Sequence, residues 1–330
     1  MTGLKKKLFT AACALFICAV LSACGISSPE PSKIGTVTRD ETQGSTSDVK
    51  QSTAASKTTE APLKDVYYVG DIVEVKGVKL VYTACGEYVS SNSFTKPNDG
   101  NKFVFLEFYA ENVGTSTVSV SFIDFKGYAD GYAVDQKYFS ENAIGGSLSS
   151  GRWDFGRIYF EVPANASEIE AEYEYDMLKS KKLKFAYEGE KDSGFVPEAK
   201  TTPSENVFKP GDVIDAGKFR ISYLSCDYFE SDNRFIQPDE GNVFVYLELE
   251  FENTSDSDRS VNSLLFECYA DGRVCQMTAL RDDDLSASLS PGRKAKGTVA
   301  FQVPKDASVI EVEFKDSLFG SAKTVFGFEK

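Results

Sequence analysis

From about residue 66 onward, hydrophobic and polar positions alternate in short runs that are separated by turn residues. Alternation with a period of two predicts strands that bury one face. In the first half of the chain we expect strands at 78–82, 103–112, 119–128 and 155–162. The last of these stops at Pro163, because proline cannot donate to a sheet ladder. No segment after the first 23 residues shows a helical period, so the pattern predicts an all-β, immunoglobulin-like sandwich.

This pattern occurs twice, at a constant offset of 141 residues, as for Gly70 and Gly211 (211 − 70 = 141). A period of this length indicates a tandem duplication of one domain. We predict copy one at 65–192, a linker at 193–206 and copy two at 207–330. The repeated motifs are Gly70-Asp71 and Gly211-Asp212, Asn112 and Asn253, Asp130-Gly131 and Asp271-Gly272, Gly151-Arg152 and Gly292-Arg293, and Val162-Pro163 and Val303-Pro304.

Taken together, these motifs resemble the telokin-like, immunoglobulin-like extracellular domain of many bacterial surface lipoproteins, a domain of unknown function. The marks are the opening Gly-Asp, a Gly-Asn-x-Phe-Val strand, the Asn that ends a strand, the Asp-Gly hairpin, and Ser-Leu-Ser-x-Gly-Arg before Phe-x-Val-Pro. The resemblance covers both copies. It implies a fold and a location outside the cytoplasm, and it implies no activity.

The first 23 residues form a predicted signal peptide, with three lysines ahead of an apolar stretch that is too short to span a membrane. Small residues lead to Cys24, a pattern similar to the bacterial lipobox, which implies cleavage after Ala23 and diacylglyceryl attachment to Cys24. The alternative is an ordinary secretory signal with a chance cysteine. Residues 24–64 are rich in Ser and Thr, and we expect a flexible tether between the membrane and the domains.

Composition excludes several classes of function. The chain has no histidine, so it cannot form a Ser-His-Asp or Cys-His hydrolase or a histidine-ligated metal site. Its net charge of −14 argues against nucleic acid as a partner. A hydrolase built on two carboxylates stays open, although no pair of acids stands out in the sequence.

Four cysteines lie in the two copies. Counting outward from the Asp271-Gly272 turn places Cys268 directly opposite Cys275, within disulfide range. We therefore predict a disulfide, and the alternative is a pair of packed thiols. Cys85 and Cys226 occupy the same position in the two copies, which favours a structural thiol over a bridge between the copies.

Two acidic features are candidate sites. The acids between Glu168 and Asp176 alternate with apolar residues, and we expect them to pair with Lys182 and Lys184 on a solvent-facing sheet. Asp282, Asp283 and Asp284 contain enough oxygens for calcium. Copy one lacks this cluster, so we expect no metal or other cofactor as part of the shared domain, and calcium is the alternative.

Phe94 and Phe235 lie in equivalent polar loops. Each is either a binding anchor or a side chain that folds back over the open end of the sandwich, and we favour the second interpretation. Trp153 occurs in copy one only, with Lys294 in its place in copy two.

These features favour a lipid-anchored, non-enzymatic binding or adhesion module for a protein, peptide or glycan on the outer face of a bacterial membrane. Duplication fits binding, because two linked weak sites gain avidity. The alternatives are a structural spacer or accessory subunit of an envelope complex and, less favoured, a carboxylate hydrolase.

Overall fold

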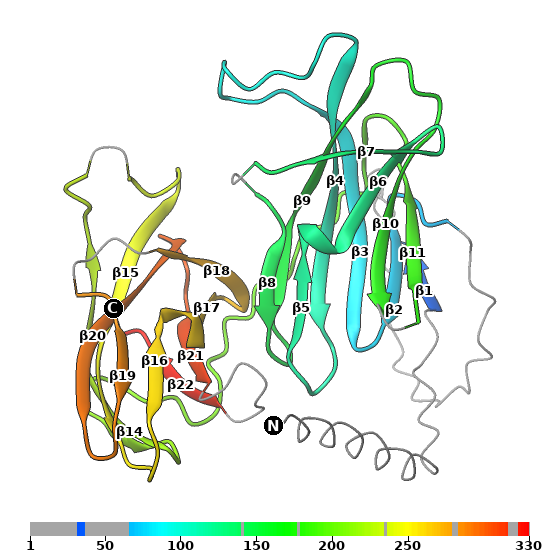
Figure 1. The fold of residues 1–330 in the computed structure, drawn as a ribbon. Coiled ribbons are helices and arrows are strands. Elements are labelled where there is room, and N and C mark those ends of the chain that lie inside the picture. Colours follow the sequence, from blue (N-terminus) through cyan, green and yellow to red (C-terminus); the bar gives the residue numbers. More distant parts are fainter. Residues whose placement is uncertain are drawn as a thin grey trace, which may run out of the picture. The chain divides into compact units, whose positions relative to one another are not determined.

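The computed structural model describes residues 32–36, 66–139, 142–176, 179–233, 236–278, 283–315 and 323–329. In Figure 1 copy one runs from cyan to green and copy two from yellow-green to red. Strands and two short 3-10 turns are the regular elements of these ranges. No helix in the described part of the chain is long and apolar enough to cross a membrane. The all-β prediction with two sandwich copies is confirmed.

Copy one consists of two antiparallel sheets and a small separate strand pair. One strand, β7, pairs with β9 in the first sheet and with β6 in the second, so the chain passes between the sheets there. The first sheet contains, in order, β2 (Asp71–Val75), β3 (Val78–Tyr88), β4 (Asn101–Asn112), β9 (Trp153–Pro163) and β7 (Tyr132–Lys137), and β12 (Lys191–Asp192) lies beside β3. The second sheet contains β7, β6 (Phe125–Ala129), β10 (Ile169–Asp176) and β11 (Lys181–Ala186). The small pair is β5 (Val118–Ser121) and β8 (Gly145–Leu148).

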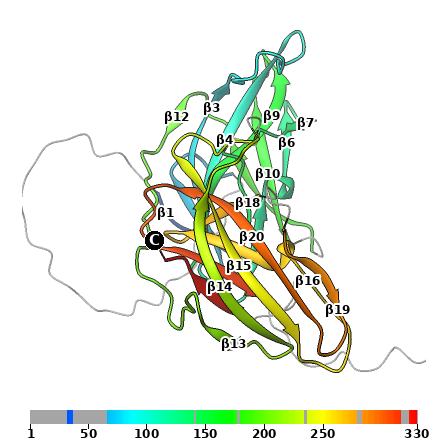
Figure 2. The same cartoon turned by 90° about the vertical axis from the view of Figure 1, so that its left-hand side faces the viewer.

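Copy two repeats this arrangement, and β18 takes the part of β7. Figure 2 shows its strands β14, β15 and β20 side by side. Its first sheet contains, in order, β13 (Val213–Asp215), β14 (Phe219–Phe229), β15 (Asn242–Asn253), β20 (Lys294–Pro304) and β18 (Arg273–Thr278). Its second sheet contains β18, β17 (Phe266–Ala270), β21 (Ile310–Lys315) and β22 (Lys323–Gly327). Its small pair is β16 (Arg259–Asn262) and β19 (Ser286–Leu289).

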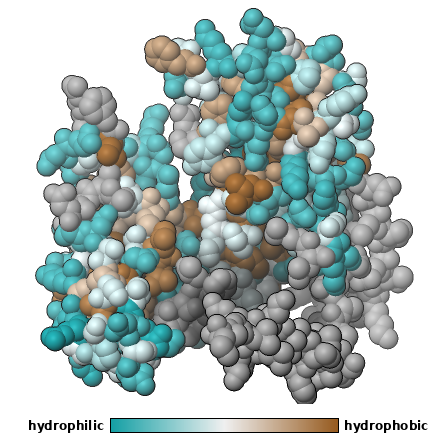
Figure 3. Space-filling model, in the orientation of Figure 1, coloured by the Kyte–Doolittle hydropathy of each residue, from teal (hydrophilic) through white to brown (hydrophobic). Residues whose placement is uncertain are grey.

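Each copy has its own hydrophobic core between its two sheets. Phe108, Phe160 and Phe185 are fully buried in copy one, and Phe251 and Phe326 are fully buried in copy two. Hydrophilic residues cover much of the visible surface, with smaller hydrophobic areas between them (Figure 3). The period-two alternation thus separates core from solvent, as expected for sheets that bury one face.

The repeated motifs have structural roles. Asn112 is fully buried, and its amide group donates to the carbonyls of Ser116 (2.8 Å) and Leu148 (2.7 Å); Asn253 makes the equivalent bonds at the same distances. Asp130 and Gly131 have φ of 49° and 79°, the positive values that a type I′ hairpin requires. These motifs therefore hold the fold.

Two sequence predictions need correction. The single strand expected at 119–128 is interrupted by a 3-10 turn at Phe122–Asp124, where the Asp124 carboxylate accepts the Ser121 N–H at 2.8 Å and the chain crosses from β5 to β6. Within the expected flexible tether, Ser32–Thr36 forms a strand, β1, that pairs with β2. The exposed edge of a sheet can add a strand through backbone hydrogen bonds alone, so little side-chain pattern is needed.

Candidate functional site: a groove beneath the linker

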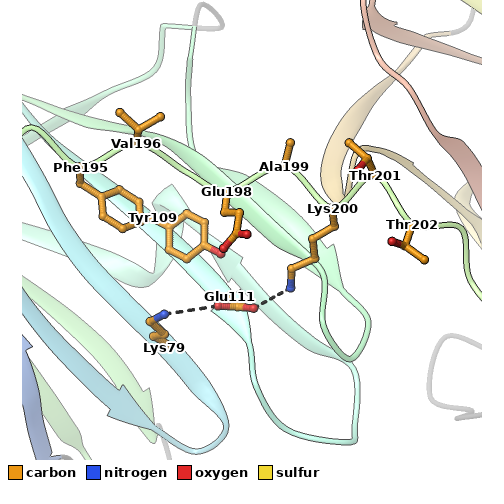
Figure 4. A pocket seen from close by; sticks show the side chains of 10 residues that line it. All are labelled: Lys79, Tyr109, Glu111, Phe195, Val196, Glu198, Ala199, Lys200, Thr201 and Thr202. Atoms are coloured by element: carbon orange, nitrogen blue, oxygen red, sulfur yellow. Dashed lines mark hydrogen bonds and ion pairs between the residues drawn. The ribbon is translucent and has the colours of Figure 1, made fainter. Parts of the chain in front are cut away.

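Residues 195–202 of the linker run across the outer face of β3 and β4 in copy one and enclose a groove of about 700 Å³ (Figure 4). A volume of this order is typical of ligand pockets. The lining residues are Lys79, Tyr109, Glu111, Phe195, Val196, Glu198, Ala199, Lys200, Thr201 and Thr202.

The floor of the groove is aromatic. The Tyr109 ring lies 5.1 Å from that of Phe195 and 5.5 Å from that of Trp153, measured between centroids. These rings belong to a small cluster on the outside of the sheet, separate from the sandwich core. Burial of Phe195 against this cluster explains why the linker follows the sheet, because apolar area leaves water there.

Near Lys200, ion pairs hold the linker segment against copy one. Lys200 Nζ is 2.6 Å from Glu111 Oε1, and Lys79 Nζ is 3.6 Å from Glu111 Oε2. Burial alone would raise the pKa of Glu111, but the hydrogen bond and charge of Lys200, together with the charge of Lys79, lower it. Lys200 also donates to the carbonyl of Gly151. Glu111 is therefore an ionised anchor for the linker.

The rim of the groove is exposed and polar. Val196 is 81% exposed, and Glu198 projects beside the Tyr109 ring in Figure 4. Among the described residues, the backbone N–H groups of Val196, Glu198 and Ala199 have no hydrogen-bond partner. Open backbone donors are groups that pair with an extended chain, and the Tyr109 ring beneath them is 5% exposed.

The equivalent face of copy two has different chemistry. Glu250 and Lys294 stand at the positions of Tyr109 and Trp153, and their side chains form an ion pair of 2.9 Å. Sequence reasoning noted Trp153 and missed Tyr109, Phe195 and the groove. Comparing the two copies position by position would have revealed this aromatic pair, because both rings lie at points where an apolar side chain replaces a charge.

A second set of residues connects the two copies. Arg152, in the β8–β9 turn of copy one, inserts between Glu311 and Glu313 of copy two, whose carboxylates are buried. Ser149 Oγ donates to Glu313 at 2.6 Å, and the Arg152 guanidinium lies 4.6 Å from the centroid of the Tyr269 ring. The Tyr269 hydroxyl donates to the carbonyl of Ser147 at 2.6 Å. We call the outer surface of β17 and β21, with Tyr269, Glu311 and Glu313, the acceptor face.

Trp153 belongs to this interface as well. Its backbone N–H donates to the carbonyl of Gly272 at 3.1 Å, and its indole N–H to the carbonyl of Asp271 at 3.3 Å. Lys200 N–H also donates to Asp271, at 2.8 Å. The groove in copy one and the contact with copy two therefore share Trp153 and Lys200.

The predicted aromatic anchors have separate outcomes. Phe94 is 96% exposed, so the interpretation that it folds back over the sandwich is wrong. The turn that holds it is closed by Asn92, whose side chain accepts the Phe94 N–H at 3.0 Å and turns the loop away from the core. Phe235 lies outside the described residues.

The cysteines lie where the register placed them. Cys268 is opposite Cys275 in the β17–β18 hairpin, and both are free thiols in the structure, so the disulfide stays a prediction. Burial raises the pKa of the Cys268 thiol. Cys85 is buried, donates to the carbonyl of Gly189 at 3.2 Å and is a free thiol, as is Cys226.

The acidic features behave differently from each other. Lys182 pairs with Glu172 (2.6 Å) and Lys184 with Glu170 (3.3 Å), as expected for a solvent-facing pair of strands. The Asp283 carboxylate accepts a hydrogen bond from the Thr298 hydroxyl, and the backbone of Asp284 forms an isolated β-bridge with Thr298. Asp282 and Cys24 lie outside the described residues. No cluster of three potential metal ligands occurs in the ranges that the structure describes.

With this geometry the chain can be compared with known proteins. The model of a family described as a domain of unknown function (DUF4352) matches residues 67–184 and 208–324, one match in each copy. The chain therefore belongs to this family, in two tandem copies, and the resemblance expected from the motifs is confirmed. No curated protein matches the chain.

The solved structures that match part of the chain include three bacterial proteins. The yjhA protein of Bacillus subtilis is 14% identical, with 37% of this chain and 98% of that chain covered and a TM-score of 0.31. A proposed lipoprotein (ycdA) of Bacillus subtilis is 18% identical, with 34% and 36% covered and a TM-score of 0.30, so the match spans about a third of that protein. An uncharacterized β-sandwich protein of Clostridium difficile is 14% identical, with 41% and 100% covered and a TM-score of 0.27.

Proposed function

We propose that this protein is a lipid-anchored, extracytoplasmic binding module without enzymatic activity, and that the groove beneath the linker binds an extended peptide segment. The groove itself carries the proposal: an aromatic floor, ionised anchors and open backbone donors converge on one surface. Lys79 and Lys200 each form an ion pair with Glu111, which suits recognition better than proton transfer.

Peptide selection followed by calorimetry tests this proposal. Peptides selected on the purified protein should lose affinity at least about tenfold with Val196→Asp or Glu198→Arg, which change the exposed rim and leave the floor intact. Val213→Asp is the matched control, because Val213 is also exposed but lies in copy two. Equal affinity for all three variants would place the ligand elsewhere, and selection of glycans alone would replace the peptide.

Membrane attachment is proposed through Cys24. Two or more acyl chains bind a membrane stably, at about 0.8 kcal/mol for each buried CH₂. Cys24→Ala should release the protein from the membrane fraction, and unchanged retention would contradict the anchor.

The disulfide between Cys268 and Cys275 is proposed for the oxidising compartment outside the cytoplasm. Alkylation of the denatured, unreduced protein should then label Cys85 and Cys226 and spare the other pair. Calcium at Asp282, Asp283 and Asp284 is a weaker proposal, and a melting temperature that calcium does not change would contradict it.

A second candidate function, a spacer within an envelope complex, is favoured by the interface between the copies. Buried ion pairs that join tandem domains suit a protein that holds a partner at a fixed separation. Capture of an envelope complex by variants with an altered groove rim would favour this role over peptide binding.

A further inference from the structure

The contact between the copies uses residues that are largely repeated at the 141-residue offset. Copy two has its own β19–β20 turn with Ser290 and Arg293 at the positions of Ser149 and Arg152. Copy one has its own version of the acceptor face, with Tyr128, Glu170 and Glu172 at the positions of Tyr269, Glu311 and Glu313. Each copy therefore contains an arginine turn and an acidic face, and the contact within the chain uses one of each; Trp153 is replaced by Lys294 in copy two, and Lys200 lies in the linker outside the repeat.

The remaining arginine turn and acidic face are open to solvent. Ser290 and Arg293 are exposed, and Tyr128, Glu170 and Glu172 are half-buried, with 20% of the Glu170 side chain and 13% of the Glu172 side chain exposed. Around Gly272, the Trp153 indole and the Lys200 side chain come within 3.0 Å of the position that a Cβ would take, whereas nothing lies within 4 Å of that position at Gly131. The hairpin tip of copy one thus has open space where, in copy two, Trp153 and Lys200 make contact.

We infer that a second copy of this chain binds head to tail, with the β19–β20 turn of one molecule seated on the outer face of β6 and β10 in the next. Arg293 would reach Glu170 and Glu172 as Arg152 reaches Glu311 and Glu313. Contacts between different surfaces of identical chains are heterologous, and they extend into chains unless the rotation closes.

Side-chain volumes agree with this docking. Within the chain, Gly146 allows Val274 to approach, because a Cβ on Gly146 would lie 2.9 Å from the Val274 methyl groups. The corresponding pair between molecules is Ala287 against Ala133. One methyl group is gained on one side and two are lost on the other, so the second contact is no more crowded than the first.

Charge makes the contact between molecules weaker than the contact within the chain. Lys323 pairs with Glu313 at 2.7 Å although Arg152 is also present, so the equivalent Lys182–Glu172 pair is compatible with docking. Lys184 is the difference: it pairs with Glu170 and stands where copy two has Val325. Arg293 has to share Glu170 with this lysine, so association is expected to depend on concentration.

Sedimentation velocity of the purified full-length chain at increasing concentration tests the inference. The wild type should show concentration-dependent dimers and longer species. Arg293→Glu and the double variant Glu170→Lys/Glu172→Lys should each stay monomeric, because each lacks one half of the contact. Lys184→Val, which copies the residue of copy two, should lower the apparent dissociation constant about tenfold.

Mixing provides the decisive control. Arg293→Glu retains an intact face on copy one, and the double variant retains an intact β19–β20 turn, so their mixture should form dimers that neither forms alone. A melting temperature close to that of the wild type shows that each variant is folded. A wild type that is monomeric at every concentration, with no change in Lys184→Val, would overturn the inference, as would a mixture that stays monomeric.

Discussion

The two copies have the same fold and the same structural motifs, yet the outer faces of their first sheets differ. On copy one the diagonal pair Tyr109–Trp153 is aromatic and covered by the linker. On copy two the same diagonal is the ion pair Glu250–Lys294 and is open to solvent. The difference shows how a duplicated domain acquires a site: two substitutions on a solvent face convert a hydrated surface into one that holds the linker.

The second sheets of the two copies differ in how their acidic side chains are paired. Copy one balances its acids internally, through Lys182 and Lys184. Copy two places Val325 at the position of Lys184, and Arg152 from copy one supplies the missing charge. The acids on the second sheet of copy one are therefore paired with lysines of the same copy, whereas those of copy two also need Arg152 of copy one.

The largest expected effect comes from Arg152. Arg152→Met leaves buried Glu311 without its strongest cation, and breaking such a buried pair costs about 3–5 kcal/mol. Urea denaturation should show the loss, with Arg293→Met as the matched control because Arg293 is exposed. Equal losses for the two variants would contradict the role given to the interface.

The next effect concerns the aromatic floor. Trp153→Lys introduces the residue of copy two, removes the indole hydrogen bond to the Asp271 carbonyl and exposes Tyr109, at a cost of about 3 kcal/mol. The linker should then be cleaved faster in limited proteolysis. Lys294→Ala at the matched position should change stability by less than about 0.5 kcal/mol. An intact linker in the Trp153 variant would show that the ring does not hold it.

A third test probes what the copies share. Asn112→Ala and Asn253→Ala each leave one buried backbone carbonyl, of Leu148 or Leu289, without its amide donor, and each should cost about 2 kcal/mol. The losses should be similar, since the two amide groups donate to equivalent carbonyls at the same distances, and Asn253 differs only by one further hydrogen bond that it accepts from Ser255 Oγ at 2.8 Å. A clear inequality in denaturation would mean that the copies are not energetically equivalent even where their geometry is.

The sequence was sufficient for the fold and insufficient for the site, for physical reasons. Alternation, the Asp-Gly hairpins and the 141-residue offset are local signals, and they predicted the strands, the hairpin register and the duplication. The turn at Phe122–Asp124 was missed because a crossing between sheets depends on tertiary packing rather than on period. The groove was missed because it is formed by the linker, which lies outside the repeat and has no pattern of its own.

The exposure of Phe94 and the contact of Arg152 are two further features that the sequence pattern does not predict. Exposure of Phe94 depends on a local turn closed by Asn92, which the composition of the loop does not specify. Arg152 belongs to a motif present in both copies, and only the contact between the copies distinguishes it from Arg293. Motifs that repeat therefore identify the domain, whereas the positions at which the repeats differ identify the site.

The last expected effect is the response of folding stability to pH. Burial raises the pKa of Glu267 to about 7, although the charge of Lys315 opposes this shift. A carboxyl group whose pKa is raised in the folded state binds its proton more tightly there. Its contribution is thus fully present below about pH 4.5 and is lost as pH rises through 7.

The free energy of unfolding should therefore fall by about 2 kcal/mol between pH 5 and pH 8 because of this group. Glu267→Gln, which stays neutral, should remove that part of the pH dependence in urea denaturation. Copy one has Lys126, an exposed residue, at the matched position, so Lys126→Gln is the control and should leave the dependence unchanged. If Glu267→Gln retains the full pH dependence, the acids around Arg152 rather than Glu267 control how the copies respond to pH.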